Sequence, residues 1–476
     1  MAKPVLMWFR QDLRLADHPA LCAAAAAGDV IPVYILDDET PGPWRMGAAS
    51  RWWLHRSLES LGSQLPLLLR RGAADKVLHD LLRETGAGAI YFTRDYAPWS
   101  GALENRVKDV CAALSATCHR YGSFLLHEPE AIRTGQGEPY KVYTPFSRAC
   151  FAKREPRPPR AAPVIKFWNE AVASDALADW RLLPTRPNWA KAFETQWQPG
   201  ETGARQRLSD FIDDGLADYA RDRDVPGRDV TSRLSPHLHF GEVSPAQCWH
   251  AARAAAVAAH GKLDQAVEKF LKEMLWREFS YHLLHHWPQL PEKPFKPEFN
   301  EFPWADDAEG LARWRKGETG FPIVDAGLRE LWATGTMHNR VRMIAASFLI
   351  KDLLLPWQEG ARWFWDTLVD ADIASNSASW QWVAGCGADA APYFRIFNPV
   401  LQGEKFDANG AYVRKWLPEL ARLPDQVLHR PWQASSTVLA AAGVELGRNY
   451  PHPVIDHGMA RNRALAALKA MKGNAQ

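Results

Sequence analysis

Apolar and polar positions alternate in blocks along the first 130 residues of the chain. Four short apolar runs predict buried strands, at Val5–Phe9, Val30–Leu36, Leu65–Leu69 and Ala89–Thr93. Stretches with helical periodicity separate or follow them, at Ala48–Leu61, Ala73–Arg83 and Ala102–Leu114. Strands that alternate with helices indicate a parallel sheet covered by helices. No GxGxxG follows the first strand, so we expect no dinucleotide at its first turn.

The pattern changes twice further along the chain. Residues 131–200 are rich in proline and charge, and after about residue 200 helical periodicity dominates, as in Leu263–Leu284 and Arg340–Leu355. The sequence therefore predicts an α/β N-terminal domain with a Rossmann-like parallel sheet at 1–130. An interdomain linker at 131–200 and an all-α C-terminal domain at 201–476 would follow.

Composition narrows the class of protein. A chain of 476 residues is too long for one core, and 47% hydrophobic with 24% charged residues is ordinary for a soluble protein. The net charge of +2 does not by itself indicate nucleic-acid binding. A local basic excess interrupted by prolines spans 148–166, and it is more typical of a semi-rigid linker than of a primary DNA groove.

The six cysteines form no CxxC pair and no zinc spacing, so we expect free thiols in a reducing compartment and no metal. The N-terminal residues lack a signal-peptide core, and no apolar run approaches membrane-spanning length. These features predict a soluble cytoplasmic protein without membrane contact.

The segment from Asp370 to Trp382 carries the clearest chemical signal. If it is helical from Asp372 onward, Asp372, Asn376 and Trp380 stack on one face. A carboxylate, an amide and an indole suit a polar heteroaromatic ligand, although a solvated amphipathic helix would show the same pattern. Trp382 would point to nearly the opposite side from Trp380.

Longer motifs carry a resemblance. Asp370–Trp382 continues into Asp-Ala-Ala-Pro-Tyr-Phe-Arg-Ile-Phe-Asn-Pro from Asp389 and Gln-Gly-Glu-Lys-Phe-Asp from Gln402. Near the N-terminus stands Trp-Phe-Arg-Gln-Asp-Leu-Arg-Leu-Ala-Asp-His-Pro-Ala-Leu from Trp8. Over essentially the whole chain these resemble the signatures of the DNA photolyase and cryptochrome family, closest to bacterial cyclobutane pyrimidine dimer (CPD) photolyases. The resemblance implies a monomer that binds damaged DNA and FAD and splits pyrimidine dimers by electron transfer from photoexcited reduced FAD.

A hydroxyl-rich segment precedes Pro236, and by itself it could be a simple helix cap or a phosphate site at a helix N-terminus. The resemblance implies that it holds the FAD diphosphate and adenosine portion. The full set of cofactor-binding residues implied in this way is Tyr219, Thr231, Ser232, Arg233, Leu234, Ser235, Phe270, Arg342, Asp370, Asp372 and Asn376. Arg342 is expected to pair with Asp370.

Two further faces suit base recognition. Glu273, Trp276 and Arg277 have i, i+3, i+4 spacing, as do Asn339, Arg342 and Met343. An indole can stack on a base, a carboxylate can contact a pyrimidine edge and a guanidinium can bind phosphate. A surface ion pair beside a half-buried Trp is the simpler alternative for the first face. The implied DNA- and lesion-binding set is Arg223, Glu273, Trp276, Arg277, Asn339, Arg340, Met343, Trp382 and Gln402.

The resemblance assigns catalytic roles to five residues: Glu273, Asn376, Trp304, Trp357 and Trp380. Glu273 would stabilise the dimer radical anion, and Asn376 would place an uncharged amide beside flavin N5. The three tryptophans match the relay of indoles from flavin to surface, with a packing role as the alternative for each.

Two related functions stay open. A signalling cryptochrome is disfavoured by Glu273, Trp276 and Asn376 and by the absence of a long C-terminal tail, and a six-four photolyase by Asn339 after His338. The segment from Gly47 to His55 favours a 5,10-methenyltetrahydrofolate antenna. Tyr-Ala-Pro-Trp from Tyr96 stands where enterobacterial relatives have an Asn-Glu pair, so 8-hydroxy-5-deazaflavin or no antenna remains an alternative.

Overall fold

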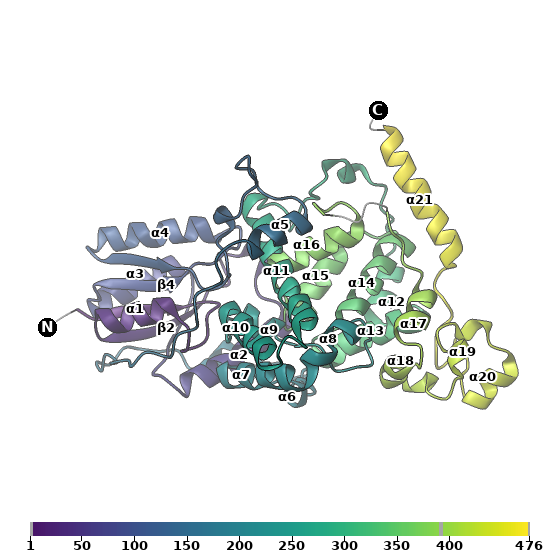
Figure 1. Cartoon of the computed structure of the whole chain (residues 1–476), viewed down its shortest axis with the longest axis horizontal. Coiled ribbons are helices and arrows are strands. Elements are labelled where there is room, and N and C mark those ends of the chain that lie inside the picture. The colour runs from purple at the N-terminus through teal and green to yellow at the C-terminus, as the bar shows by residue number, and fades with distance from the viewer. Residues whose placement is uncertain (1–2, 390–393, 475–476) are drawn as a thin grey trace. The chain divides into compact units, whose positions relative to one another are not determined.

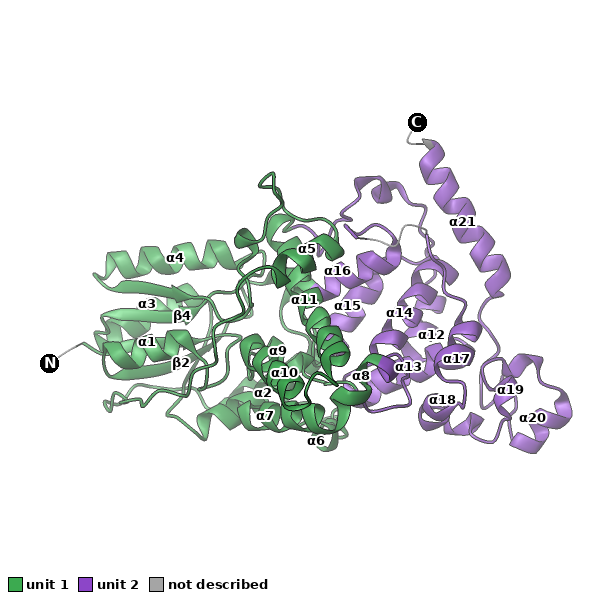
Figure 2. Cartoon of the chain, viewed as in Figure 1, with its two compact units in different colours: residues 1–220, 231–288, 369–374 green, residues 221–230, 289–368, 375–476 purple. Residues whose placement is uncertain are grey.

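The computed structural model describes residues 3–389 and 394–474 (Figure 1). The chain divides into two compact units (Figure 2). Unit 1 comprises residues 1–220, 231–288 and 369–374, and unit 2 comprises 221–230, 289–368 and 375–476. These units follow packing, whereas the boundaries proposed from the sequence follow the change from strands to helices. The sheet therefore shares its unit with the first helices of the all-α region.

A five-stranded parallel sheet forms the N-terminal part of unit 1, in the order β3-β2-β1-β4-β5. Its strands are β1 (Val5–Phe9), β2 (Val30–Leu36), β3 (Leu68–Arg71), β4 (Ala89–Thr93) and β5 (Thr117–Tyr121). In the central register Trp8 lies opposite Val33 of β2 and Phe92 of β4. The predicted α/β class, with a parallel sheet, is confirmed.

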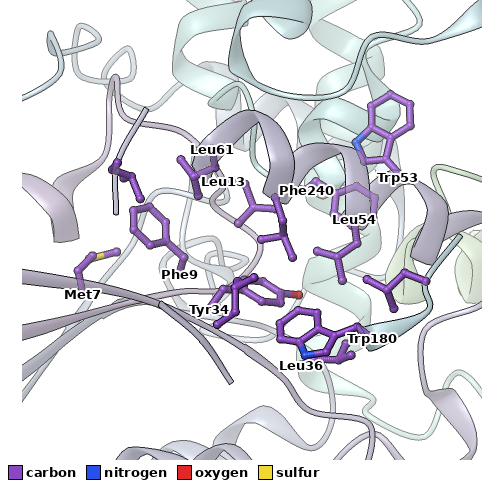
Figure 3. Close-up of a cluster of buried hydrophobic side chains, with 14 of the residues drawn as sticks. Met7, Phe9, Leu13, Tyr34, Leu36, Trp53, Leu54, Leu61, Trp180 and Phe240 are labelled. Carbon is purple, nitrogen blue, oxygen red and sulfur yellow. The ribbon is translucent and has the colours of Figure 1, made fainter. Parts of the chain in front are cut away.

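Alternate residues of β1 serve two hydrophobic cores, because successive strand side chains point to opposite faces. Met7 and Phe9 belong to a core that includes Leu54 and Leu61 of helix α2 (Figure 3). Trp8 belongs to the second core, on the other face of the sheet. The helices beside the strands are α1 (Pro19–Ala27), α2 (Ala48–Gly62), α3 (Ala74–Thr85) and α4 (Ser100–Ala113).

Helices and the loops that connect them make up the rest of both units. Unit 1 and its boundary contain α5 (Tyr143–Phe151), α6 (Phe193–Gln196), α7 (Glu201–Asp210), the π-helix η4 (Phe211–Gly215), α8 (Leu216–Asp222), α9 (Ser235–His239), α10 (Pro245–Ala258) and α11 (Asp264–His286). The remaining α-helices are α12 (Ala308–Lys316), α13 (Pro322–Thr334), α14 (Asn339–Ser347), α15 (Trp357–Thr367), α16 (Ile373–Ala384), α17 (Pro399–Phe406), α18 (Ala411–Trp416), α19 (Asp425–Leu428), α20 (Ser436–Ala442) and α21 (His457–Asn474).

Several predicted bounds shift by one or two residues, and two predicted elements differ more. The strand expected at Leu65–Leu69 begins at Leu68, because Pro66 has no N–H to donate and Leu67 N donates to Leu65 O in a tight turn. The helix expected to run to Leu355 changes after Ser347 into a π-helix, η6 (Phe348–Asp352). The π-helix ends at Asp352, and the φ of +62° at Leu354 takes the chain out of the right-handed helical region two residues later.

The N-terminal signature joins the sheet region to the helices of unit 1. Arg14 is fully buried, and its guanidinium donates to Gly241 O at 2.8 Å and to Asp17 O at 2.9 Å. Ser244 in turn donates to Asp17 Oδ2 at 2.5 Å. Because every partner is buried, these bonds hold residues 14–17 against the start of α10 with little competition from water. The signature is therefore a structural clamp in this chain.

Candidate functional site

The segment Thr231–Ser235 leads into α9 in unit 1. Arg233 adopts a positive φ of +48°, and Leu234 follows in the right-handed helical region. When one residue has a left-handed and the next a right-handed helical backbone conformation, their N–H groups point to the same side. Such a pair forms an anion-binding nest. Arg207 fixes the opposite side of the segment, because it donates to Ser232 O at 3.0 Å and to Thr231 O at 3.1 Å. Arg207 was not predicted from the sequence, because it lies more than 20 residues from its partners.

Tyr219 belongs to an aromatic cluster in the same unit. Its ring meets Phe211 edge-on at 5.4 Å and Phe270 at 6.0 Å, and Phe211 and Phe270 lie 4.8 Å apart. Phe211 begins the π-helix η4, an irregularity that the sequence pattern does not reveal. The structure thus brings together two residues assigned to the cofactor, and it adds a third.

Two buried carboxylates follow immediately after α15. Ser235 Oγ donates to Asp370 Oδ2 at 2.6 Å, so the hydroxyl segment and the Asp370 motif meet within unit 1. Asp372 accepts a hydrogen bond from Tyr281, and His239 Nδ1 lies 3.5 Å from its Oδ2. Burial raises the pKa of Asp372, but His239, the Arg277 charge and the Tyr281 hydroxyl outweigh it and lower the pKa to about 2. Asp372 is therefore an anion throughout the neutral range.

Helix α16 carries Asn376 and Trp380, which belong to unit 2, and it begins at Ile373, one residue later than the start at Asp372 that the sequence predicts. Asn376 Nδ2 donates to Ala361 O at 3.0 Å, so one end of its amide is fixed. Trp380 is 2% exposed and packs directly on Gly360, where a Cβ would lie 2.0 Å from the indole. Only glycine at 360 allows this close approach.

The tryptophans of the expected relay differ in burial. Trp357 is buried and Trp304 is partly exposed. This difference suits a relay that runs from the interior to the surface. Trp380 contacts Phe364 at 5.0 Å and Trp314, an indole outside the predicted relay, at 6.3 Å. Trp382 is partly exposed while Trp380 is buried, in agreement with the predicted opposite directions. Electron transfer along the predicted relay stays a prediction.

The face predicted on α11 forms only in part. Glu273 is 28% exposed at its side chain, 3.6 Å from Lys269 Nζ, and Trp276 is partly exposed. Arg277, in contrast, donates to Phe124 O at 2.9 Å and lies over the Phe124 ring at 4.2 Å. Its donors are directed into unit 1, so a phosphate contact by Arg277 has no support from the geometry.

Helix α14 presents the second predicted face in unit 2. Asn339 is exposed and Met343 partly exposed, while His338 caps the helix by accepting from Arg340 N at 3.2 Å. Burial lowers the pKa of His338 to about 4, so this ring is neutral at pH 7. The Arg342 guanidinium donates to Met337 O at 2.7 Å. Since Asp370 belongs to unit 1, the Arg342–Asp370 pair stays a prediction.

The two arginines assigned to phosphate share one carboxylate. Arg340 donates to Asp224 Oδ2 at 2.8 Å and lies over the Phe406 ring at 4.4 Å, and Arg223 Nε lies 3.9 Å from Asp224 Oδ1. A carboxylate between two guanidiniums keeps them apart and oriented. This arrangement suits an anionic ligand at the surface of unit 2.

Gln402 lies on α17, and its buried Oε1 has no hydrogen-bond partner among the described residues. An unsatisfied buried acceptor is costly unless a ligand or water completes it. Of the motif that begins at Asp389, residues 390–393 lie outside the described part of the chain. The segment resumes at Phe394 and Arg395.

The region of the expected antenna is closely packed. At the carboxyl ends of β1 and β4, Arg10 bridges Asp95 at 3.1 Å and Glu104 at 3.0 Å. This is where the strand order reverses, the usual position for a ligand of an open α/β sheet. Trp53 of the Gly47–His55 segment is fully buried and donates to Glu242 at 3.0 Å. Both features stabilise unit 1 without help from a ligand.

These features fit FAD. Unit 1 holds a backbone nest for a diphosphate and two buried carboxylates that can accept from ring or ribose donors. His239 Nδ1 is buried 3.5 Å from Asp372 Oδ2, so a third polar group lies beside these carboxylates. An apolar core would carry none of these groups. The chemistry of the donors and acceptors matches what a flavin dinucleotide requires.

Comparison with known proteins shows the family to which the chain belongs. Residues 5–164 match the DNA photolyase family, and residues 270–470 match the FAD binding domain of DNA photolyase. The chain belongs to the DNA photolyase and cryptochrome family. Within it, the deoxyribodipyrimidine photo-lyase of Agrobacterium fabrum is 50% identical over 98% of both chains. Cryptochrome-1 of Arabidopsis thaliana is 39% identical over 98% of this chain and 70% of its own.

Solved structures agree with this membership. A bacterial class III photolyase from Agrobacterium tumefaciens superposes with a TM-score of 0.96 and 50% identity, covering 99% of this chain and 98% of that one. The predicted fold class is thereby confirmed for both the sheet and the helical part. Among the described residues, no helix is long and apolar enough to cross a membrane. Nor do they contain a group of three His, Cys, Asp or Glu side chains placed to hold a metal ion.

Proposed function

We propose that this chain is a deoxyribodipyrimidine photo-lyase that splits cyclobutane pyrimidine dimers in DNA with light. Glu273 and Trp276 on one helix carry this proposal, because a carboxylate beside an indole can both stack on a pyrimidine and contact its polar edge. They lie in the unit that holds the buried Asp370 and Asp372. Full-length identity of 50% to a photo-lyase supports the same reading.

In this proposal FAD is held by the nest at Thr231–Ser235, by Tyr219 and Phe270, and by Asp370 and Asp372. Bound reduced FAD supplies the electron that light drives into the dimer. Asp372, an anion because its pKa is near 2, accepts from donors of the isoalloxazine ring. Asn376 adds an uncharged amide, and Arg342 contributes a cation that balances negative charge.

The DNA is bound by two kinds of residue. Arg223 and Arg340 contact phosphates, which position the duplex without reading sequence. Recognition of the extruded dimer is assigned to Glu273 and Trp276 of unit 1 and to Asn339, Met343, Trp382 and Gln402 of unit 2. Extrusion costs a few kcal/mol and costs least for a damaged pair, so the lesion itself favours entry into the pocket. Glu273 then stabilises charge that develops on the dimer carbonyl edge.

We also propose an electron relay, an antenna chromophore, a localisation and an oligomeric state. Trp304, Trp357 and Trp380 carry an electron from the surface to restore the reduced cofactor. The antenna is 5,10-methenyltetrahydrofolate, with 8-hydroxy-5-deazaflavin or no antenna as alternatives. We propose a cytoplasmic monomer.

One purified preparation tests the whole proposal. Chromatography of chromophores released by denaturation should recover FAD at about one per chain, and the absorption spectrum identifies any antenna. The reduced protein should then restore dimer-containing oligonucleotides in blue light but not in the dark. Failure to bind FAD even after reconstitution contradicts the proposal.

A blue-light photoreceptor of the cryptochrome type is the second candidate, favoured by 39% identity to Cryptochrome-1 of Arabidopsis thaliana. The same assay separates the two functions. A protein that binds FAD and responds to light but leaves every dimer intact would be a photoreceptor, not a repair enzyme.

A further inference from the structure

Helix α5 carries a tyrosine that lies flat against Trp276. The Tyr143 and Trp276 rings are 3.6 Å apart between centroids and inclined by only 7°. Both residues belong to unit 1, and Tyr143 is 8% exposed whereas Trp276 is partly exposed. One face of the indole is therefore covered by another ring inside the same unit.

Face-to-face overlap is not the arrangement that two free aromatic rings prefer, since offset and edge-on contacts are more favourable. Other contacts must therefore hold this one in place. Tyr143 Oη donates to Lys272 O at 2.6 Å, and Lys272 precedes Trp276 by one helical turn. Phe279 meets both rings edge-on at 5.9 Å. The tyrosine is thus fixed along one turn of α11, with its ring on the indole.

A covered face has two consequences for the indole. It limits the rotation of Trp276, so less side-chain entropy is lost when a base stacks on it. It also leaves only the remaining part of the indole for stacking, so a base can approach from one side. The surface around Tyr143 is compatible with nucleic acid, because Lys141 and Arg148 are both exposed.

We propose that Tyr143 is a positioning residue that holds Trp276 as a one-sided stacking platform for the extruded dimer. This inference rests on the proposed repair function. Tyr143 contacts no part of the DNA in this role and acts only through Trp276. The ring is the active part, whereas the hydroxyl fixes the ring.

Titration with dimer-containing and undamaged duplex tests the role, using full-length protein loaded with FAD. Tyr143→Ala should lower affinity for damaged DNA about tenfold, the order expected when one side chain must be immobilised on binding. Affinity for undamaged duplex should stay the same, because phosphate contacts dominate it. Tyr143→Phe keeps the ring, so its affinity for damaged DNA should fall much less. Phe151→Ala, at the other end of α5, removes packing against Trp249 and serves as control.

A double-mutant cycle separates positioning from general destabilisation. If Tyr143 acts through Trp276, Tyr143→Ala should have no further effect on discrimination in a Trp276→Ala background. The inference would be overturned if Tyr143→Ala lowered discrimination equally in the wild-type and Trp276→Ala proteins. It would also be overturned if Tyr143→Ala lowered affinity for undamaged DNA as much as affinity for damaged DNA. A wild-type protein that does not prefer damaged DNA would instead overturn the repair function, and this inference with it.

Discussion

Ser235 donates a hydrogen bond to Asp370 at 2.6 Å, and this bond joins two motifs that lie 135 residues apart. The carboxylate follows the end of α15, and the hydroxyl stands at the start of α9. Neither element has a local reason to place a polar group in the interior of unit 1. The bond therefore organises the proposed FAD site before any cofactor arrives.

Ser235→Ala should weaken FAD retention by roughly twofold to tenfold, the range expected for one net hydrogen bond of about 0.5–1.5 kcal/mol. Asp370→Asn should weaken it further, because the carboxylate charge is also lost. Dialysis against increasing urea, followed by flavin absorbance, measures the release. Ser147→Ala removes a hydroxyl of the same unit that bonds Thr144 O, and it should retain FAD normally.

Asn376→Asp should favour the protonated, neutral form of bound reduced FAD, because a second negative charge near the ring opposes an anion. It should also destabilise the fold by about 1–3 kcal/mol, since Ala361 O loses its donor and faces a carboxylate. Spectrophotometric pH titration of the reduced protein and thermal unfolding measure the two effects separately. Asn376→Ala loses the same hydrogen bond without adding charge, so an identical titration for both variants would exclude the charge argument.

The sheet and the main helices could be predicted because their signals are local and repetitive. Apolar runs gave β1, β2 and β4 with the observed bounds, and periodicity gave α11 to within two residues at each end. The edge strand β5 was not predicted, because its sequence Thr-Cys-His-Arg-Tyr has no apolar run. Edge strands can be polar, since one side is open to water.

The candidate site was harder to predict, because long side chains are directed by distant partners. The spacing of Glu273, Trp276 and Arg277 is a property of one helix, but Phe124, 153 residues earlier, decides where Arg277 points. Three further side chains also contact other elements. Arg207 bonds the Ser232 carbonyl, Tyr143 stacks on the Trp276 ring and Tyr281 bonds the Asp372 carboxylate. No periodicity in the sequence records such contacts.

Trp380→Phe should abolish light-driven reduction of bound oxidised FAD, while repair by chemically reduced enzyme survives. The indole is the more easily oxidised ring, and the smaller Phe ring fits against Gly360 without a clash. Flavin absorbance during illumination with an external reductant follows the first activity, and dimer restoration the second. Trp249→Phe, a buried substitution in α10, should change neither. Parallel loss of both activities in Trp380→Phe would indicate a packing role.

His282 should make unit 1 less stable in acid. Burial, with a smaller contribution from the charge of His286, lowers the pKa of His282 from 6.5 to about 4. The unfolded chain therefore binds more protons between about pH 6.5 and 4, so stability falls as pH falls through this window. The full shift corresponds to about 3 kcal/mol. Urea unfolding of His282→Phe at several pH values should show a smaller loss, whereas Phe279→Leu should shift stability equally at each pH.

Trp276→Ala and Arg340→Ala should separate lesion recognition from phosphate binding. Loss of one stacking platform costs about 1–3 kcal/mol, so Trp276→Ala should weaken binding to dimer-containing DNA by roughly 5- to 150-fold and leave undamaged duplex almost unaffected. Arg340→Ala should weaken both DNAs, because it removes a phosphate contact and leaves Asp224 with one guanidinium fewer.

Salt dependence distinguishes these outcomes. Titrations of both duplexes at several salt concentrations should show a slope smaller by about one unit for Arg340→Ala, and an unchanged slope for Trp276→Ala. Arg223→Ala is expected to follow Arg340→Ala, since both guanidiniums share Asp224. If Trp276→Ala lowered both affinities equally, the indole would not stack on an extruded base. The photoreceptor function would then account better for the site, because a receptor needs the flavin but no lesion pocket.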